Sequence, residues 1–277
     1  MFFGRITSYN QITYIQANCP GQPAVPECYK GCYMHIQREW TIEFDEKEII
    51  SHLSGSLEKL MERPALRADW EAALADGRRL IQPAAVWDTF PIREFKHERL
   101  VLENGAKITG GPVAKVLGGA TLFIAAVCTV GDAISKMITA QQQDGLRMRG
   151  MFLDSLGTWA VGQMRMQLFS QLEHVAIESG LHASTSLSPG ESEWPVSEQS
   201  VLFSLLDTQQ IGVSLTKTML MVPVKSLSLI MGTGPGPLGS EGGSNCDFCT
   251  IRDRCPYRQT RQAPEANLPV ITQPKTI

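Results

Sequence analysis

The sequence predicts an α+β or mixed α/β fold, and two observations support this class. Between about residues 41 and 230, strand-like segments alternate with segments whose apolar residues recur at helical spacing. Of the 277 residues, 43% are hydrophobic and 19% are charged, so the chain can bury a core. We therefore expect a central domain, residues 41–231, after a Cys-bearing N-terminal extension, residues 1–40. A Gly/Pro-rich linker with cysteines, residues 232–262, and a polar tail, residues 263–277, follow it.

The central domain is expected to begin with a short strand and two helices. Residues 41–44 alternate in polarity as a strand would, and Asp45 suits the N-cap of a helix whose apolar residues extend to Leu60. We expect Pro64 to end this helix, because proline interrupts the helical hydrogen bonds. A second helix is predicted over residues 66–80.

The remaining elements follow from the same two periodicities. Strands are predicted at residues 86–95, 99–102, 120–130, 211–215 and 219–231. Helices are predicted at residues 113–117, 132–142, 146–179 and 197–206. Asp144 and Gly145 separate the two long helical segments, and residues 232–243 are expected to form a flexible exit.

Charge and hydropathy exclude several classes of protein. The chain has 25 basic and 28 acidic residues and a formal net charge of −3, so no basic excess predicts nucleic-acid binding. The longest uncharged stretch, residues 116–131, is shorter than the roughly 20 residues of a membrane-spanning helix. The N-terminus lacks the charged start and continuous apolar run of a signal peptide. We therefore expect a cytoplasmic protein without a membrane span.

A cysteine triad near the C-terminus is the strongest local signal for chemistry. It has C-x2-C-x5-C spacing and consists of Cys246, Cys249 and Cys255. A two-residue gap lets two thiolates reach one metal ion or cluster, and Gly242 and Gly243 let backbone amides approach the sulfurs. The triad is predicted to bind an iron–sulfur cluster of the 4Fe-4S type. Zinc is the alternative metal, and three unrelated reduced thiols are the remaining interpretation.

A second cysteine triad lies near the N-terminus. It consists of Cys19, Cys28 and Cys32. Its spacing matches no zinc or iron–sulfur pattern closely, so it either holds a separate metal, lends a ligand to the first triad, or is not a metal site. His35 is close enough in sequence to be a further ligand. The seventh cysteine, Cys128, lies in the apolar segment 120–130 and is expected to be a small buried core residue.

Four ordered motifs occupy the second half of the central domain. They are Leu187-Ser-Pro-Gly-Glu-Ser-Glu-Trp-Pro-Val-Ser-Glu-Gln199, Leu202-Phe-Ser-Leu-Leu-Asp207, Ile211-Gly-Val-Ser-Leu-Thr216 and Met221-Val-Pro-Val-Lys-Ser226. With residues 122–131 and 153–157, they resemble the activation domain of cobalamin-dependent methionine synthase, especially its free-standing forms in anaerobic bacteria and archaea. The C-terminal triad followed by Pro256-Tyr-Arg258 resembles an extension of those forms. The resemblance covers roughly residues 40–258.

This resemblance implies a curved antiparallel sheet with helices, a domain that binds S-adenosylmethionine and caps cobalamin while an inactive Co(II) form is reduced and remethylated. The residues that it assigns to cofactor binding are Ser188, Pro189, Gly190, Glu191, Trp194 and Pro195. Where the family's loop carries an Arg followed by a Gly-Tyr pair, this chain has Gly190-Glu191, and a Glu on a helix of the family is replaced here by Gly162. Both differences weigh against S-adenosylmethionine binding.

Three functions follow, and no catalytic residue is assigned for any of them. The leading one is an accessory protein whose iron–sulfur cluster delivers electrons to a corrinoid protein, because reduction of Co(II) to Co(I) needs a low-potential donor. The second is a methyltransferase component in which residues 187–199 bind adenosylmethionine or cobalamin. The third is a zinc-stabilised interaction module without catalysis. The expected partner is a corrinoid protein or methyltransferase in a larger complex.

Overall fold

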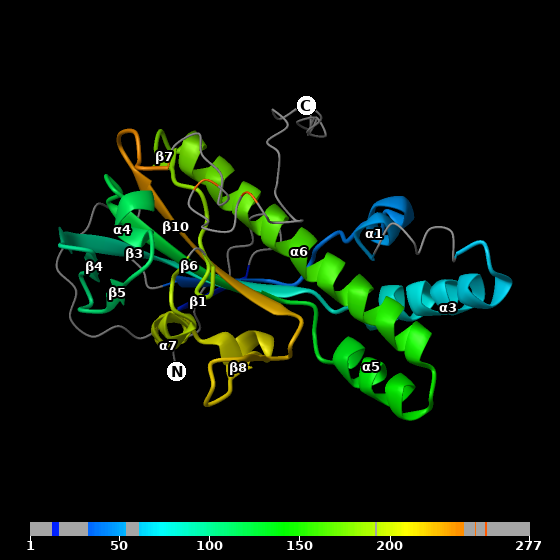
Figure 1. Cartoon of the computed structure of the whole chain (residues 1–277). Coiled ribbons are helices and arrows are strands. Elements are labelled where there is room, and N and C mark those ends of the chain that lie inside the picture. The colour runs from blue at the N-terminus through cyan, green and yellow to red at the C-terminus, as the bar shows by residue number, and fades with distance from the viewer. Residues whose placement is uncertain are drawn as a thin grey trace, which may run out of the picture.

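A curved antiparallel sheet forms the centre of the protein in a computed structural model (Figure 1). The structure describes residues 13–16, 33–53, 61–191 and 193–240, with residues 247 and 253. The sheet has eight strands, six of them in the order β1-β2-β3-β6-β10-β7, while β4 pairs with β3 and with β5. Every strand pair is antiparallel, as the resemblance implied.

The strands differ greatly in length, and the longest ones are central. They are β1 (Thr13–Gln16), β2 (Tyr33–Gln37), β3 (Ala84–Lys96), β4 (Arg99–Leu102), β5 (Lys107–Thr109), β6 (Leu122–Thr129), β7 (His182–Ala183) and β10 (Ser226–Gly234). A separate hairpin consists of β8 (Ser214–Leu215) and β9 (Met221–Val222). The sheet therefore takes in strands from before residue 41 and continues beyond residue 231.

Helices flank the sheet on both sides. They are α1 (Glu46–Leu53), α3 (Pro64–Leu80), α4 (Val113–Val116), α5 (Ala133–Gln143), α6 (Arg147–Glu178) and α7 (Gln199–Leu205), with short 3-10 helices η2 (Val196–Glu198) and η3 (Thr208–Ile211). The predicted helices over 66–80, 132–142 and 146–179 are confirmed. Within the described residues no helix has both the length and the apolar character that a membrane span requires.

Alternation along the strands gives the sheet two faces with separate cores. The helix-covered face presents Trp87 and Leu229 to α6 and α3. The loop-covered face presents Val86, Val127 and Ile230 to α4, α7 and the chain that leads into α7. Figure 1 shows α6 crossing the first face diagonally and α4 and α7 lying on the other.

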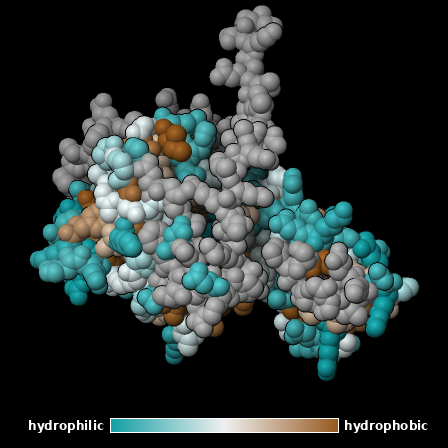
Figure 2. Space-filling view, turned by 45° about the horizontal axis from the view of Figure 1, so that its top comes forward, coloured by the Kyte–Doolittle hydropathy of each residue, from teal (hydrophilic) through white to brown (hydrophobic). Residues whose placement is uncertain are grey.

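One end of α6 extends past the sheet. There it packs against α3 and α5, and we call these two helices with the first half of α6 the helical lobe. In Figure 2 the lobe forms a mass of its own beside the sheet region, and the hydrophobic residues on the described surface lie as separate patches among polar ones. A single helix of 32 residues, about 48 Å long, thus joins the two regions.

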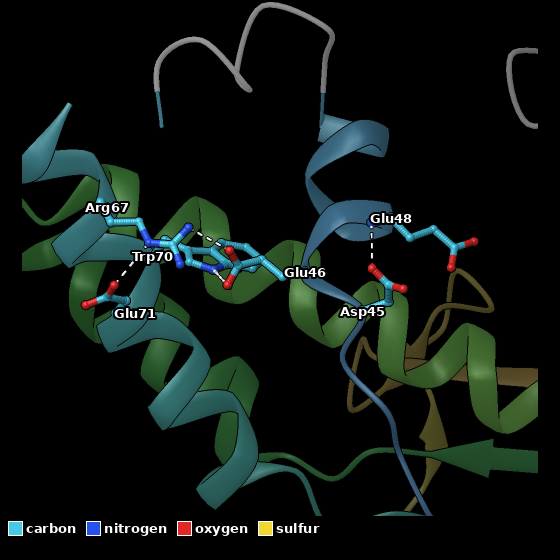
Figure 3. A network of polar contacts seen from close by, with 6 residues as sticks. All are labelled: Asp45, Glu46, Glu48, Arg67, Trp70 and Glu71. Atoms are coloured by element: carbon cyan, nitrogen blue, oxygen red, sulfur yellow. Dashed lines mark hydrogen bonds and ion pairs between the residues drawn. The ribbon is translucent and has the colours of Figure 1, made fainter. Parts of the chain in front are cut away.

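Polar contacts fix the start of α1 against α3 (Figure 3). The Oδ1 atom of Asp45 accepts the backbone N–H of Glu48 at 2.9 Å, which confirms the predicted N-cap. The carboxylate of Glu46 accepts hydrogen bonds from Arg67 at 2.6 Å and from the indole of Trp70 at 2.9 Å. Trp70 is fully buried, so its indole N–H cannot donate to water, and the Glu46 carboxylate accepts its hydrogen bond instead.

Several predicted elements differ from the structure. Residues 41–44 form no strand, because Ile42 and Phe44 pack as half-buried side chains against the helices instead. Pro64 does not end a helix; it is the first residue of α3, where its missing N–H costs nothing. The predicted strand 219–231 is interrupted between β9 and β10, and residue 211 belongs to η3.

The expected flexible exit also differs, because its first residues continue β10 to Gly234. A Cβ on Gly232 would lie 2.8 Å from the Cβ of Ala120, and one on Gly234 would lie 2.7 Å from the carbonyl oxygen of Gly119. Glycine therefore permits close packing against the α4–β6 turn at this point of the strand.

Candidate functional site

The segment that carries the predicted cofactor-binding residues follows the edge of β10. After β7, the backbone N–H of Leu187 donates to the carbonyl of Ile230 at 3.0 Å, and the reverse hydrogen bond is 2.8 Å. The hydroxyl of Ser188 donates to the carbonyl of Ser228 at 2.5 Å. Ser188 and Pro189 are both buried, so neither is exposed to solvent.

Beyond this edge the chain makes two tight turns. The N–H of Glu191 donates to the carbonyl of Ser188 at 3.0 Å, and the N–H of Trp194 donates to the carbonyl of Glu191 at 2.8 Å. Gly190, with φ +95°, donates to the carbonyl of Trp194 at 2.7 Å. This left-handed backbone conformation favours glycine, so Gly190 permits the turn that places Glu191 at the surface.

Glu191 pairs with an arginine of α6. Nη1 and Nη2 of Arg165 donate to the two carboxylate oxygens at 2.8 Å and 3.0 Å, a bidentate geometry. The Arg165 side chain is 19% exposed and the Glu191 side chain 38%. The motif in the sequence includes Glu191 but gives no sign of Arg165, because the partners are 26 positions apart and no spacing rule connects them.

The other end of the loop is anchored in the core of the loop-covered face. Trp194 is 1% exposed, and its indole N–H donates to the carbonyl of Thr109 at 3.0 Å. Gly111 allows this contact, because a Cβ there would lie 2.7 Å from the Cβ of Trp194. The carboxylate of Glu198 accepts both the N–H and the hydroxyl of Thr109 at 2.9 Å. Trp194 is therefore an anchor and is not available for stacking on a ligand.

The structure thus divides the six predicted cofactor-binding residues into two groups. Three of them are buried and hold the loop to the sheet: Ser188, Pro189 and Trp194. The others are at the surface: Gly190, Glu191 and Pro195. Only this second group lies where a ligand or partner can reach it.

Among the described residues, nothing covers a strip of α6 beside Arg165. Gly162 precedes Arg165 by three residues, on the same side of the helix, and a Cβ at Gly162 would meet nothing within 4 Å among the described atoms. At the other side of Gly162, the ammonium of Lys225 contacts Asp154 and the Thr158 hydroxyl, each at 2.8 Å. Two basic groups therefore flank the open strip.

Asp88 and His35, on the neighbouring strands β3 and β2, have shifted pKa values. By alternation Asp88 belongs to the loop-covered face, where burial raises the pKa of its carboxyl to about 6 despite a hydrogen bond from the Thr89 N–H. His35 stacks on Trp87 with 5.2 Å between ring centroids, and burial lowers the pKa of its imidazole. Its neighbours give His35 a place in the sheet core.

The two cysteine triads lie outside the described residues. Within the described part of the chain, no group of three or more His, Cys, Asp or Glu side chains is placed to hold a metal ion. Cys128 is 1% exposed in β6, as predicted, and burial raises the pKa of its thiol to about 12.

Comparison with known structures supports the fold. The chain is similar to a crystal structure of the MetH reactivation domain bound to AdoHcy, with a TM-score of 0.50 and 12% sequence identity. The match covers 77% of this chain and 87% of that one. It confirms the predicted α+β class with a curved antiparallel sheet. No protein-family model matches the sequence. No curated protein matches it significantly.

Proposed function

We propose that this protein is an accessory component of corrinoid-dependent methyl transfer that supports reductive activation of a corrinoid-bearing partner. The observation that carries the proposal is the fold shared with the MetH reactivation domain over 77% of the chain. The four motifs that resemble the methionine synthase activation domain fall on consecutive elements, from the loop after β7 to the start of β10. Fold alone does not specify function, so the proposal also needs a surface and a chemical role.

The surface that we assign to the partner includes the β8–β9 hairpin. Leu220 is 63% exposed, Val222 44% and Val224 72%, which is unusual for three apolar side chains so close together. The hairpin belongs to the same stretch of motifs as the surface residues of the 187–199 loop. We therefore propose that these two segments contact the corrinoid partner.

The chemical role that we assign to the chain ends is electron delivery. Cys246, Cys249 and Cys255 have spacing suited to an iron–sulfur cluster, and such clusters reach the low potentials needed to reduce Co(II). The N-terminal triad is proposed as a second source of ligands. A cytoplasmic location is part of the proposal, because thiols stay reduced there.

S-adenosylmethionine fits this loop poorly. The MetH reactivation domain in the similar structure is bound to AdoHcy. In this chain, both carboxylate oxygens of Glu191 and both terminal nitrogens of Arg165 are used by each other. As paired here, the two side chains present no free carboxylate to the sulfonium of such a ligand, so the proposed function does not depend on its binding.

Metal and sulfide analysis of anaerobically purified protein tests the redox role. We expect iron, acid-labile sulfide and a visible spectrum that dithionite bleaches, and Cys249→Ser should lose them. Cys128→Ala is the matched control and should keep its iron, because this thiol is sealed in the core. A colourless protein loaded with zinc contradicts electron transfer and leaves an interaction module.

Partner binding is tested separately with a Co(II) corrinoid protein and a low-potential electron donor. We expect Leu220→Asp and Val224→Asp to slow the appearance of the Co(I) spectrum at limiting partner concentration. Val175→Asp is the control, since Val175 is 54% exposed but lies on α6. Equal activation by all three variants would contradict the proposed surface.

A further inference from the structure

We propose that Arg165 is a carboxylate-binding position, and that Glu191 occupies it as an internal competitor until a ligand carboxylate takes its place. The inference rests on the proposed function only in taking the 187–199 loop as the ligand-facing side. The ligand class is a small organic carboxylate. Three features support this: the two members of the ion pair differ in burial, backbone hydrogen bonds hold the loop independently of the pair, and no described residue covers the helix surface beside Arg165.

The two partners are unequal in their access to water. Arg165 is the more buried, and its Nε lies out of reach of solvent with no hydrogen-bond partner among the described residues. Glu191 is twice as exposed, so its carboxylate can exchange this contact for water at low cost. The guanidinium cannot do the same, because a buried unpaired charge is strongly unfavourable. Arg165 therefore favours any carboxylate that replaces Glu191.

The loop does not need the ion pair to keep its shape. Its turns are closed by backbone hydrogen bonds from Gly190, Glu191 and Trp194. The Ser188 hydroxyl fixes one end to β10, and the buried Trp194 indole fixes the other to Thr109. Rotation of the Glu191 side chain alone is enough to free Arg165, so exchange requires no rearrangement of the fold.

The described residues leave space for an incoming group on α6. The open position at Gly162 lies one turn before Arg165, and Met166, which is 54% exposed, follows directly. Arginine binds carboxylates through two parallel N–H donors, the geometry that Glu191 now uses. A ligand with a carboxylate and an apolar group could thus contact the Arg165 guanidinium, the backbone at Gly162 and the Met166 thioether together.

Thermal unfolding in sodium acetate against sodium chloride at equal ionic strength tests this inference on the full-length protein. In Glu191→Ala, acetate at about 100 mM should raise the melting temperature by the order of 2 °C over chloride. Wild type should show a much smaller rise, because Glu191 competes at high local concentration. The double variant Glu191→Ala/Arg165→Met should show none.

Controls separate a specific site from a general salt effect. Glu193→Ala removes an exposed carboxylate from the same loop and should behave as wild type. If Glu191→Ala does not fold, Glu191→Gln replaces it, and a smaller acetate-specific rise is expected. Absence of a rise in the variant that folds, or an equal rise in the double variant, would overturn the inference. No corrinoid or metal takes part, so failure here is distinct from failure of the proposed function.

Discussion

The helical lobe and the sheet edge each contain an arginine of α6 paired with a distant carboxylate, but the two pairs are built differently. In the lobe, Asp76 accepts hydrogen bonds from Arg149 at 2.6 Å, Arg79 at 3.0 Å and Gln141 at 3.2 Å, and its side chain is only 13% exposed. At the sheet edge, the Glu191 carboxylate pairs with Arg165, and the Glu191 side chain is 38% exposed.

The pKa of Asp76 reflects this difference. Burial alone would raise the pKa of its carboxyl, yet the hydrogen bonds and charges of Arg149 and Arg79 outweigh burial and lower it. Asp76 joins α3, α5 and α6, so its network holds the lobe together. The Glu191 pair joins one loop to one helix whose positions are already fixed. The first pair is structural, and the second is free to serve binding.

The anchor of the loop provides the largest expected effect. Trp194→Ala should lower the free energy of unfolding by about 4 kcal/mol, because it removes a fully buried indole and leaves a cavity beside Gly111. Denaturant unfolding measures the change. Trp159→Ala is the control, since Trp159 is only half-buried on α6, and it should cost clearly less. A smaller loss of unfolding free energy for Trp194→Ala than for Trp159→Ala would mean that the buried Trp194 side chain does not anchor the loop.

The second-largest loss of stability is expected when the Asp76 network of the lobe is broken. Asp76→Ala should destabilise the protein by about 3 kcal/mol, because it leaves Arg149 and Gln141 partly buried without their partner. The same denaturant experiment applies. Asp132→Ala removes an exposed carboxylate paired with Lys136 in the same lobe and should change stability little. Equal effects of the two variants would mean that the Asp76 network does not hold the lobe together.

Asp88 differs from both pairs, because it is a sheet carboxyl without an ion pair among the described residues. Its pKa is raised from 3.8 to about 6, so the folded state holds its proton more tightly than the unfolded state does. Stability should therefore fall as pH rises from about 4 to 6 and stay lower above that. Asp88→Asn should stabilise the protein at pH 7 by about 2 kcal/mol.

Unfolding measured from pH 4 to pH 7 checks this sign. The Asp88→Asn profile should lack the fall seen in the wild type. Asp76→Asn should have the opposite effect at pH 7, a loss of stability, because the pKa of Asp76 is lowered. A wild-type profile that rises between pH 4 and 6 and is unchanged by Asp88→Asn would contradict the assigned role.

The smallest effect is expected at the exchangeable pair. Glu191→Ala should cost less than about 1 kcal/mol, since the carboxylate is partly exposed and the loop keeps its backbone hydrogen bonds. Denaturant unfolding at low and high salt measures it, with Glu193→Ala as the control. A loss as large as that for Asp76→Ala would show that the pair is structural.

Much of the fold could be predicted because it depends on local pattern. The N-cap at Asp45, the strands 99–102 and 120–130 and the helix 146–179 follow from capping and periodicity. The prediction that Pro64 ends a helix was wrong, because a proline in the first turn of one helix and a proline after the last turn of another look alike in sequence. The prediction that a flexible segment begins at Gly232 was wrong, because the residues that pack against Gly232, Leu117 and Ala120, are remote in the chain.

The candidate site could be predicted only in part, for a related reason. Motifs selected Gly190, Glu191 and Trp194, but their different roles depend on burial. The pairing of Glu191 with Arg165 depends on how α6 crosses the sheet, which no local spacing encodes. Gly162 marked a missing side chain in the sequence, and only the fold shows that it leaves open surface beside Arg165.

The sealed position of Cys128 has a practical consequence for counting thiols. With a pKa of about 12 and 1% exposure, this thiol stays protonated and inaccessible to alkylating reagents near neutral pH. Every label taken up by the native protein must therefore come from the six cysteines near the chain ends. Alkylation followed by mass spectrometry thus reports the accessibility of these six thiols without any mutation, and Cys128 becomes modified only when the sheet unfolds.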